Sequence, residues 1–252
     1  MQDLKPFFEK AGLPIEIEAK PLFNVQNDSI FQLTIANRDK STQTRKKGEF
    51  FRMYCGGKDV NIVALDADPK HQQVLLSVQE PKRVFYEKVY NRKTQTFDDV
   101  RRVVSEAKRK FLVGMDECHL FMSQIPSVGC VNKVKDAHVA LKPKDIAALE
   151  TQTKKKVLRQ GEWFFIHVTP AEQEAIDLLG KVVQNKVRID QRSRSGKPHT
   201  PDFLVRVKDV DFVQGSVRHA DHTTLKLPEG WHRVQRNTEI RQEGRTFGGW
   251  ID

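Results

Sequence analysis

The sequence predicts an α+β protein, mostly antiparallel sheet or a small barrel with a packed amphipathic helix, plus a second, smaller β-rich unit. Short runs of alternating apolar and polar residues recur along the chain, separated by Gly, Pro, Asn and Asp. One segment, 98–110, has the apolar spacing of an amphipathic helix. A helix-capping pattern at 169–172 directly follows a strongly apolar run. Together these observations favour sheets with a few covering helices.

The first part of the chain predicts one short helix and then a series of strands. Residues 4–11 form an amphipathic segment that ends at Gly12 and Pro14. The alternating runs that follow predict strands at 15–18, 31–35, 49–54, 61–65, 74–78 and 83–90. Their short, regular spacing is typical of an antiparallel sheet.

The segment 98–110 predicts the clearest helix. Its apolar residues recur at intervals of three and four positions, at Val100, Val103, Val104, Ala107 and Phe111. Acidic residues begin the segment and basic residues end it, which suits the helix dipole. We expect Val103 and Val104 to lie in the core and the cations to face outward.

The second half predicts both helices and strands. Strands are expected at 112–114 and 119–125, and short helices at 134–141 and 143–149. A buried strand at 161–167 leads into a helix with Thr169 and Glu172 as a capping box and Gly180 at its end. Four more strands are expected, at 203–207, 212–217, 223–227 and 231–235. We divide the chain into a β-rich domain at 1–126, a helical connector at 127–160 and an α+β unit at 161–252.

The composition of the chain limits the kinds of partner and the cellular location that we expect. The 252 residues include 43 Lys and Arg against 33 Asp and Glu, a net charge of +10, which favours a polyanionic partner such as DNA or RNA. No apolar run approaches the roughly 20 residues that span a bilayer, so we expect no membrane partner. The N-terminal residues lack the pattern of a secretory signal, and Cys55, Cys118 and Cys130 form no CxxC pair. We therefore expect a cytoplasmic protein with reduced thiols.

A cluster of histidine and aspartate residues near the end of the chain is the main candidate for chemistry. His219, Asp221, His222 and His232 could supply a site of two histidines and one carboxylate for a metal ion. The alternative, which we favour on spacing, is a hairpin turn with local hydrogen bonds and solvent-facing histidines. Two successive hairpins would place 223–227 between the strands that carry His219 and His232, about 10 Å apart.

Asp202 is a further catalytic candidate. Pro201 and Asp202, followed by Lys208, are similar to the core of PD-(D/E)xK nucleases, in which acidic residues bind Mg²⁺. Arg206 stands where that motif has an acidic residue, so a metal ligand is lacking.

Basic residues are spread over several segments that could contact phosphates. The candidate nucleic-acid-binding residues are Arg45, Lys46, Lys47, Arg101, Arg102, Lys108, Arg109, Lys110, Arg188, Arg192, Arg194 and Lys197.

Two segments, 159–165 and 215–234, are similar to uncharacterised bacterial proteins with no assigned function. The similarity extends over most of the chain. It implies a bacterial origin, and no functional residue is carried over from it.

Three functions follow as hypotheses. The leading one is a nucleic-acid-binding or accessory protein that contacts the phosphate backbone without reading bases and needs no cofactor. The second is a metal-dependent hydrolase or nuclease that uses the His/Asp cluster and a divalent metal. The third is a protein–protein interaction module in a larger assembly.

Overall fold

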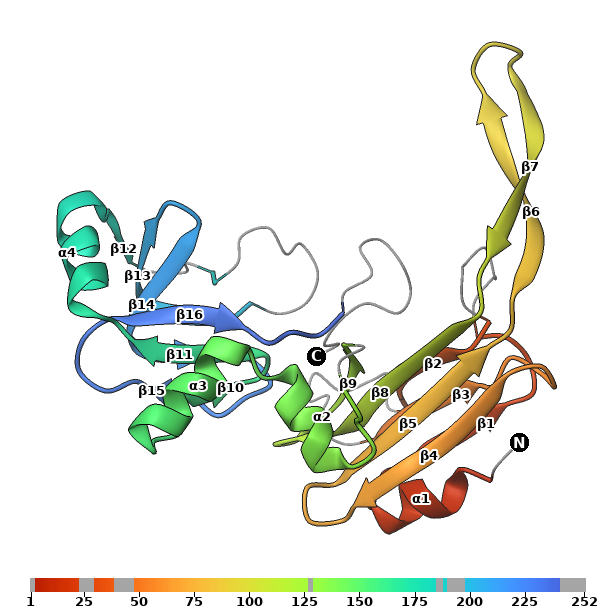
Figure 1. Ribbon diagram of the computed structural model, residues 1–252, viewed down its shortest axis with the longest axis horizontal. Coiled ribbons are helices and arrows are strands. Elements are labelled where there is room, and N and C mark those ends of the chain that lie inside the picture. The colour runs from red at the N-terminus through yellow and green to blue at the C-terminus, as the bar shows by residue number, and fades with distance from the viewer. Residues whose placement is uncertain are drawn as a thin grey trace. The chain divides into compact units, whose positions relative to one another are not determined.

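The computed structural model describes residues 3–22, 30–38, 48–126, 129–184, 188–189 and 198–240 (Figure 1). The chain divides into two compact units. The first comprises the described residues of Met1–Met115, Leu120–Ala137 and Ile240–Gly249, and the second those of Asp116–His119, His138–Glu239 and Trp250–Asp252.

The first unit contains a short helix, α1 (Lys5–Lys10), and several sheets. One sheet has the order β1-β3-β2, another β4-β5-β8-β9, and β6 pairs with β7. The strands are β1 (Ile15–Glu18), β2 (Gln32–Asn37), β3 (Glu49–Tyr54), β4 (Asn61–Asp68), β5 (Gln73–Glu80), β6 (Arg83–Asn91), β7 (Thr96–Val104), β8 (Ala107–Asp116) and β9 (His119–Ile125). All pairs with a recorded register are antiparallel except β1 with β3, which is parallel.

The second unit is built on a sheet of order β10-β11-β16-β14-β13-β12, with β15 also paired to β14. Its helices are α3 (Lys144–Thr153) and α4 (Pro170–Leu179), while α2 (Val134–Leu141) is shared between the two units. The strands are β10 (Leu158–Gln160), β11 (Trp163–His167), β12 (Val182–Gln184), β13 (Thr200–Val207), β14 (Val210–Arg218), β15 (Leu225–Lys226) and β16 (His232–Arg236).

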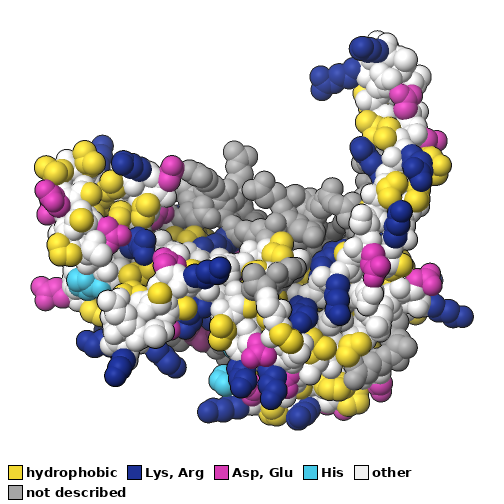
Figure 2. Space-filling view, in the orientation of Figure 1, with side chains coloured by type: hydrophobic (Ala, Val, Ile, Leu, Met, Phe, Trp, Pro, Cys, Tyr) yellow, Lys and Arg dark blue, Asp and Glu magenta, His cyan; other side chains and the backbone are white. Residues whose placement is uncertain are grey.

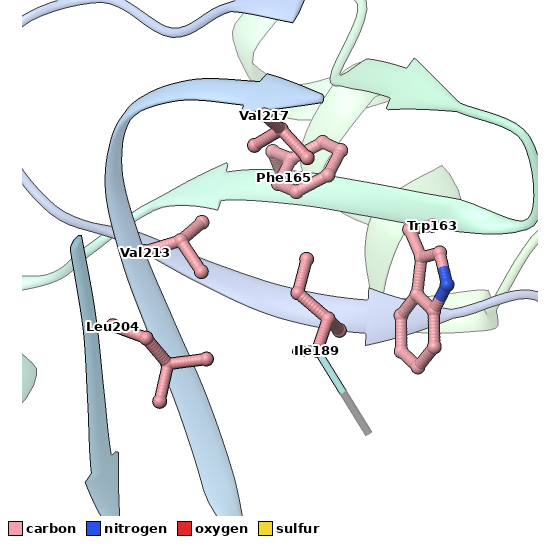
Figure 3. Close-up of a cluster of buried hydrophobic side chains, with 6 residues drawn as sticks. All are labelled: Trp163, Phe165, Ile189, Leu204, Val213 and Val217. Carbon is pink, nitrogen blue, oxygen red and sulfur yellow. The ribbon is translucent and has the colours of Figure 1, made fainter. Parts of the chain in front are cut away.

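The three consecutive aromatic residues of β11 show that both faces of this sheet are buried. Trp163 and Phe165 pack with Ile189, Leu204, Val213 and Val217 on one face (Figure 3). Phe164 points to the other face and packs with Ile166 and with Ile146 of α3. The alternation follows from the period of two in a strand. It confirms that these aromatic residues are core.

The predicted capping box at the start of α4 is confirmed. The Thr169 hydroxyl accepts a hydrogen bond from the Glu172 amide at 3.3 Å, and the Glu172 carboxylate accepts one from the Thr169 amide at 2.8 Å. Pro170 occupies the first turn, where its missing N–H costs nothing, and Gly180 ends the helix.

Among the described residues, no helix is long and apolar enough to cross a membrane.

The predicted helix at 98–110 is wrong, and so is the alternative of a small barrel. Residues 98–104 belong to β7, 107–110 belong to β8, and no closed barrel forms in the described part of the chain. Val103 is 49% exposed, so it is not a core residue, and Val104 is half-buried. The valines between 100 and 104 are β-branched and favour strands. Pairing with β6 satisfies the backbone N–H and C=O groups of β7, which in a helix would have bonded to one another.

The exposure of Val103 gives a test of this part of the fold. We expect Val103→Asp to change the free energy of unfolding by less than about 0.5 kcal/mol, as for ordinary surface substitutions. Val113→Asp is the matched control, because Val113 on β8 is fully buried and an unpaired charge there should unfold the unit. Thermal melting followed by circular dichroism measures both. Strong destabilisation by Val103→Asp would contradict an exposed β7.

Candidate metal centre

The β13–β14 hairpin brings two histidines together. The strands pair from Val207 with Val210, next to the turn, to Thr200 with Arg218 at the far end. His199 immediately precedes β13 and His219 immediately follows β14, so the next pair in this register is these two residues. Their rings stack with centroids 4.2 Å apart.

His222 completes a cluster of three imidazoles. Its ring centroid lies 4.7 Å from that of His219 and 5.6 Å from that of His199. One nitrogen atom from each residue lies within 4.8 Å of the other two. All three residues are buried, with exposed fractions of 3%, 7% and 8% for His199, His219 and His222. Among the described residues, this is the one group of three or more His, Cys, Asp or Glu close enough to share a metal ion.

The loop that carries His222 is held by Glu117. One carboxylate oxygen of Glu117 accepts hydrogen bonds from the Thr223 amide at 2.6 Å and the Thr223 hydroxyl at 2.9 Å. The other oxygen lies 3.9 Å from Nδ1 of His222. At 3.9 Å this oxygen is beyond hydrogen-bond distance of Nδ1, so it would have to move closer to orient His222 as a metal ligand.

The neighbouring residue Asp221 is also buried. Its Oδ1 lies 3.2 Å from Nε2 of His119, and the Cys118 thiol lies 3.6 Å from its backbone oxygen. His219, His222 and His232 are 7%, 8% and 2% exposed, so the solvent-facing histidines expected in this region are not observed. Asp221 thus contacts His119 and lies outside the three-imidazole cluster.

Gly161 closes one side of the cluster. It forms the tight turn between β10 and β11 and has a φ of +57°, a conformation that other residues rarely adopt. A Cβ atom at this position would lie 3.0 Å from Nε2 of His222 and 3.4 Å from Nε2 of His199. Both nitrogens therefore face the backbone of Gly161. The absence of a side chain there leaves room beside the two nitrogens.

Burial keeps the cluster uncharged at His199. Desolvation, with His219, His222 and Arg236 as smaller contributions, lowers the pKa of His199 to about 2. Arg236 is paired with Glu162 and Glu239, each at 3.1 Å. A neutral imidazole is the form that binds a metal ion, so His199 needs to lose no proton to become a ligand.

Several nitrogens of the cluster lack hydrogen-bond partners among the described residues. These are Nε2 of His199 and both ring nitrogens of His222. A buried polar atom without a partner costs about 1–3 kcal/mol. Nδ1 of His219 instead accepts a hydrogen bond from the Asp221 amide at 3.2 Å. A metal ion would satisfy the nitrogens of His199 and His222. At His219 it would compete with the Asp221 amide.

Asp202 has a different environment. It accepts a hydrogen bond from the Ser216 amide at 2.7 Å and pairs with Arg218. The Ser216 amide and then Arg218 hold the pKa of Asp202 below its usual range. It lies at the irregularity in the β13–β14 pairing, outside the three-imidazole cluster.

His232 also lies outside the cluster, but not for the reason expected. β15 does not separate the two strands, because β14 pairs directly with β16, with Val213 opposite His232. This position is several residues before His219 along β14. The His232 ring packs against His167 with centroids 5.2 Å apart, and its Nδ1 lies 3.2 Å from the Gly230 carbonyl.

The candidate nucleic-acid-binding residues differ in their exposure and in their partners. Arg101, Arg102, Lys108 and Arg188 are exposed. Arg109 pairs with the buried Glu80, and Lys110 donates to the Val131 carbonyl at 2.5 Å, so these two stabilise the first unit. The remaining candidates lie outside the described residues: Arg45, Lys46, Lys47, Arg192, Arg194 and Lys197.

The candidate set taken from the sequence omitted His199 and Gly161. A hairpin drawn symmetrically about Lys208 and Asp209 would place His199 opposite Arg218, one residue before His219. The irregularity between Pro201 and Phe203 shifts the pairing by one residue and sets His199 opposite His219, so the sequence held only part of the signal. The contact of Gly161 with the imidazoles had no sequence signal, because it joins separate hairpins.

No protein-family model, curated protein or solved structure matches this chain. The bacterial origin implied by the segments 159–165 and 215–234 therefore stays a prediction.

The environment of His232 predicts a pH dependence of stability. Burial, and to a smaller extent His167, lowers its pKa in the folded protein, although the bond to Gly230 opposes the shift. The unfolded chain then binds a proton more readily below about pH 6.5, so folding stability is lost as the pH falls through this value. We expect urea midpoints to fall from pH 8 to pH 5, and to fall less in His232→Phe. Equal pH profiles for the two proteins would contradict a depressed pKa.

Proposed function

We propose that the second unit binds one divalent transition-metal ion, with zinc favoured, through His199, His219 and His222. The observation that carries the proposal is the approach of three buried ring nitrogens to within 4.8 Å of one another. Imidazole is a common ligand of zinc and also suits copper, nickel and iron, whereas magnesium and calcium prefer oxygen. The ligand set therefore favours zinc over Mg²⁺.

The distances are compatible with this proposal. Zinc–nitrogen bonds are about 2.0–2.1 Å long, so two nitrogens of a tetrahedral site lie about 3.3 Å apart. To bind one ion the nitrogens would have to move from within 4.8 Å to that separation, and the stacked rings of His199 and His219 would have to rotate so that their in-plane lone pairs converge. The carboxylate of Glu117, 3.9 Å from Nδ1 of His222, would supply the outer contact that orients a ligating imidazole once it moves within hydrogen-bond distance.

A three-histidine set also supports hydrolysis as the chemistry of the site. Three protein ligands leave a coordination position for water, which is typical of catalytic rather than structural zinc. Neutral imidazoles do not offset the charge of the ion, and bound zinc lowers the pKa of its water to about 7. The class of reaction that fits is metal-dependent hydrolysis.

Metal content and ligand substitutions test the proposal. We expect the purified chain to bind one equivalent of zinc or cobalt in titration calorimetry, with tetrahedral absorption bands for cobalt. His199→Gln and His222→Gln should weaken binding by more than about 100-fold, since even outer contacts contribute about 10–100-fold. Glu117→Gln should weaken metal binding by about 10–100-fold, as expected for the loss of an outer contact. His219→Gln should cost less than the other ligands, because the ion competes there with the Asp221 amide.

His232→Phe is the control, because it removes a buried histidine outside the cluster and should leave one equivalent of metal bound. Hydrolysis of bis(4-nitrophenyl) phosphate by the same samples separates a catalytic ion from a structural one. Failure to bind zinc or cobalt, or an equal loss in His232→Phe, would overturn the metal centre.

Gly161 offers a test that leaves every ligand in place. We expect Gly161→Ala to reduce metal affinity, because the new Cβ would crowd Nε2 of both His222 and His199. Gly129→Ala is the matched control, since Gly129 has the same φ of +57° and no atom of the described residues within 4 Å of its Cβ position. Both variants carry similar backbone strain. Equal zinc affinity in the two, measured by calorimetry, would show that the Gly161 side of the cluster is not used.

A further inference from the structure

The β6–β7 hairpin of the first unit has a face of exposed aromatic, aliphatic and basic side chains. Residues directly opposite each other in an antiparallel pair share a face, and every second pair lies on the same side. The register gives one face the pairs Val84–Val103, Tyr86–Arg101, Lys88–Asp99 and Tyr90–Phe97. We call these eight residues the ribbon face.

The apolar members of the ribbon face are exposed to an unusual degree. Tyr86 is 66% exposed, Phe97 65% and Tyr90 51%, and Val84 and Val103 are each nearly half exposed. In the described part of the chain, β6 and β7 pair only with each other. A two-stranded hairpin alone is marginally stable in water, so a surface of this kind is typical of an interaction site.

The hairpin also carries a positive charge. Residues 81–106 contain seven Lys and Arg against four Asp and Glu, a net charge of +3 in a chain of +10. Arg101 lies opposite Tyr86 on the ribbon face, and Arg92 and Lys93 are exposed in the turn. Figure 2 shows hydrophobic and basic side chains interspersed along this hairpin.

We propose that the ribbon face binds single-stranded nucleic acid. Tyr86, Tyr90 and Phe97 would stack on bases, and Arg101 with the turn cations Arg92 and Lys93 would contact phosphates. Aromatic rings reach base faces in single strands, whereas a duplex hides those faces within its own stack. The net positive charge is complementary to phosphates and opposes docking of a second copy of the same hairpin.

Stacking residues and phosphate contacts predict different signatures. We expect fluorescence anisotropy of a labelled oligodeoxythymidine to show binding by the full chain. Tyr86→Ala and Phe97→Ala should each weaken it about 5- to 150-fold with the salt slope unchanged. Arg101→Ala should make the slope of log K against log salt shallower by about 0.7. Leu178→Ala is the matched control, because Leu178 on α4 is 75% exposed and lies in the second unit.

Circular dichroism should show that all four variants fold, since the substituted side chains are exposed. The proposal is overturned if the aromatic variants bind like Leu178→Ala, or if a duplex of equal length binds more tightly and is unaffected by them. It is also overturned if Tyr86→Ala converts a dimer to a monomer in light scattering without weakening oligonucleotide binding. That last result would assign the ribbon face to a second copy of the chain.

Discussion

The antiparallel pairing of β13 with β14 is the constraint on which the second unit depends. It fixes the position of β12 on one side and of β15 and β16 on the other. Through the same register it stacks His199 on His219 beyond the ends of the strands. A slip of one residue would turn every side chain of β13 to the opposite face. The buried residues Leu204, on one face, and Val205, on the other, hold the register in place.

Much of the fold could be predicted from local pattern. The strands β1 to β6 of the first unit follow from alternation, and the capped helix α4 follows from side-chain capping; both signals act over a few residues. The segment 98–110 could not be assigned in this way, because its valines fit both a helical and a strand spacing. Pairing with β6 determines that this segment forms strands and not a helix. It satisfies the backbone of β7 and leaves Val103 exposed. Because β6 is itself exposed, a search of the sequence for apolar stripes does not identify it as the partner of β7.

The candidate site was only partly predictable. His219 and His222 were identified by the density of histidines, but nothing local indicated that their rings are buried. Burial comes from separate parts of the unit: Gly161 in the β10–β11 turn, Glu117 in the turn after β8, and His199 before β13. The separation of His232 from the cluster depends on the direct pairing of β14 with β16, a contact that hairpin order alone does not give.

The position of β16 has a consequence for biosynthesis. β16 follows all the other described strands in chain order, yet it lies between β11 and β14, which flank it in the sheet. While the chain emerges from the ribosome, β11 and β14 each present an unpaired edge beside apolar side chains such as Phe165 and Val213. Unpaired strand edges are sites of aggregation. The nascent second unit is therefore most in need of chaperone protection until His232–Arg236 have left the exit tunnel.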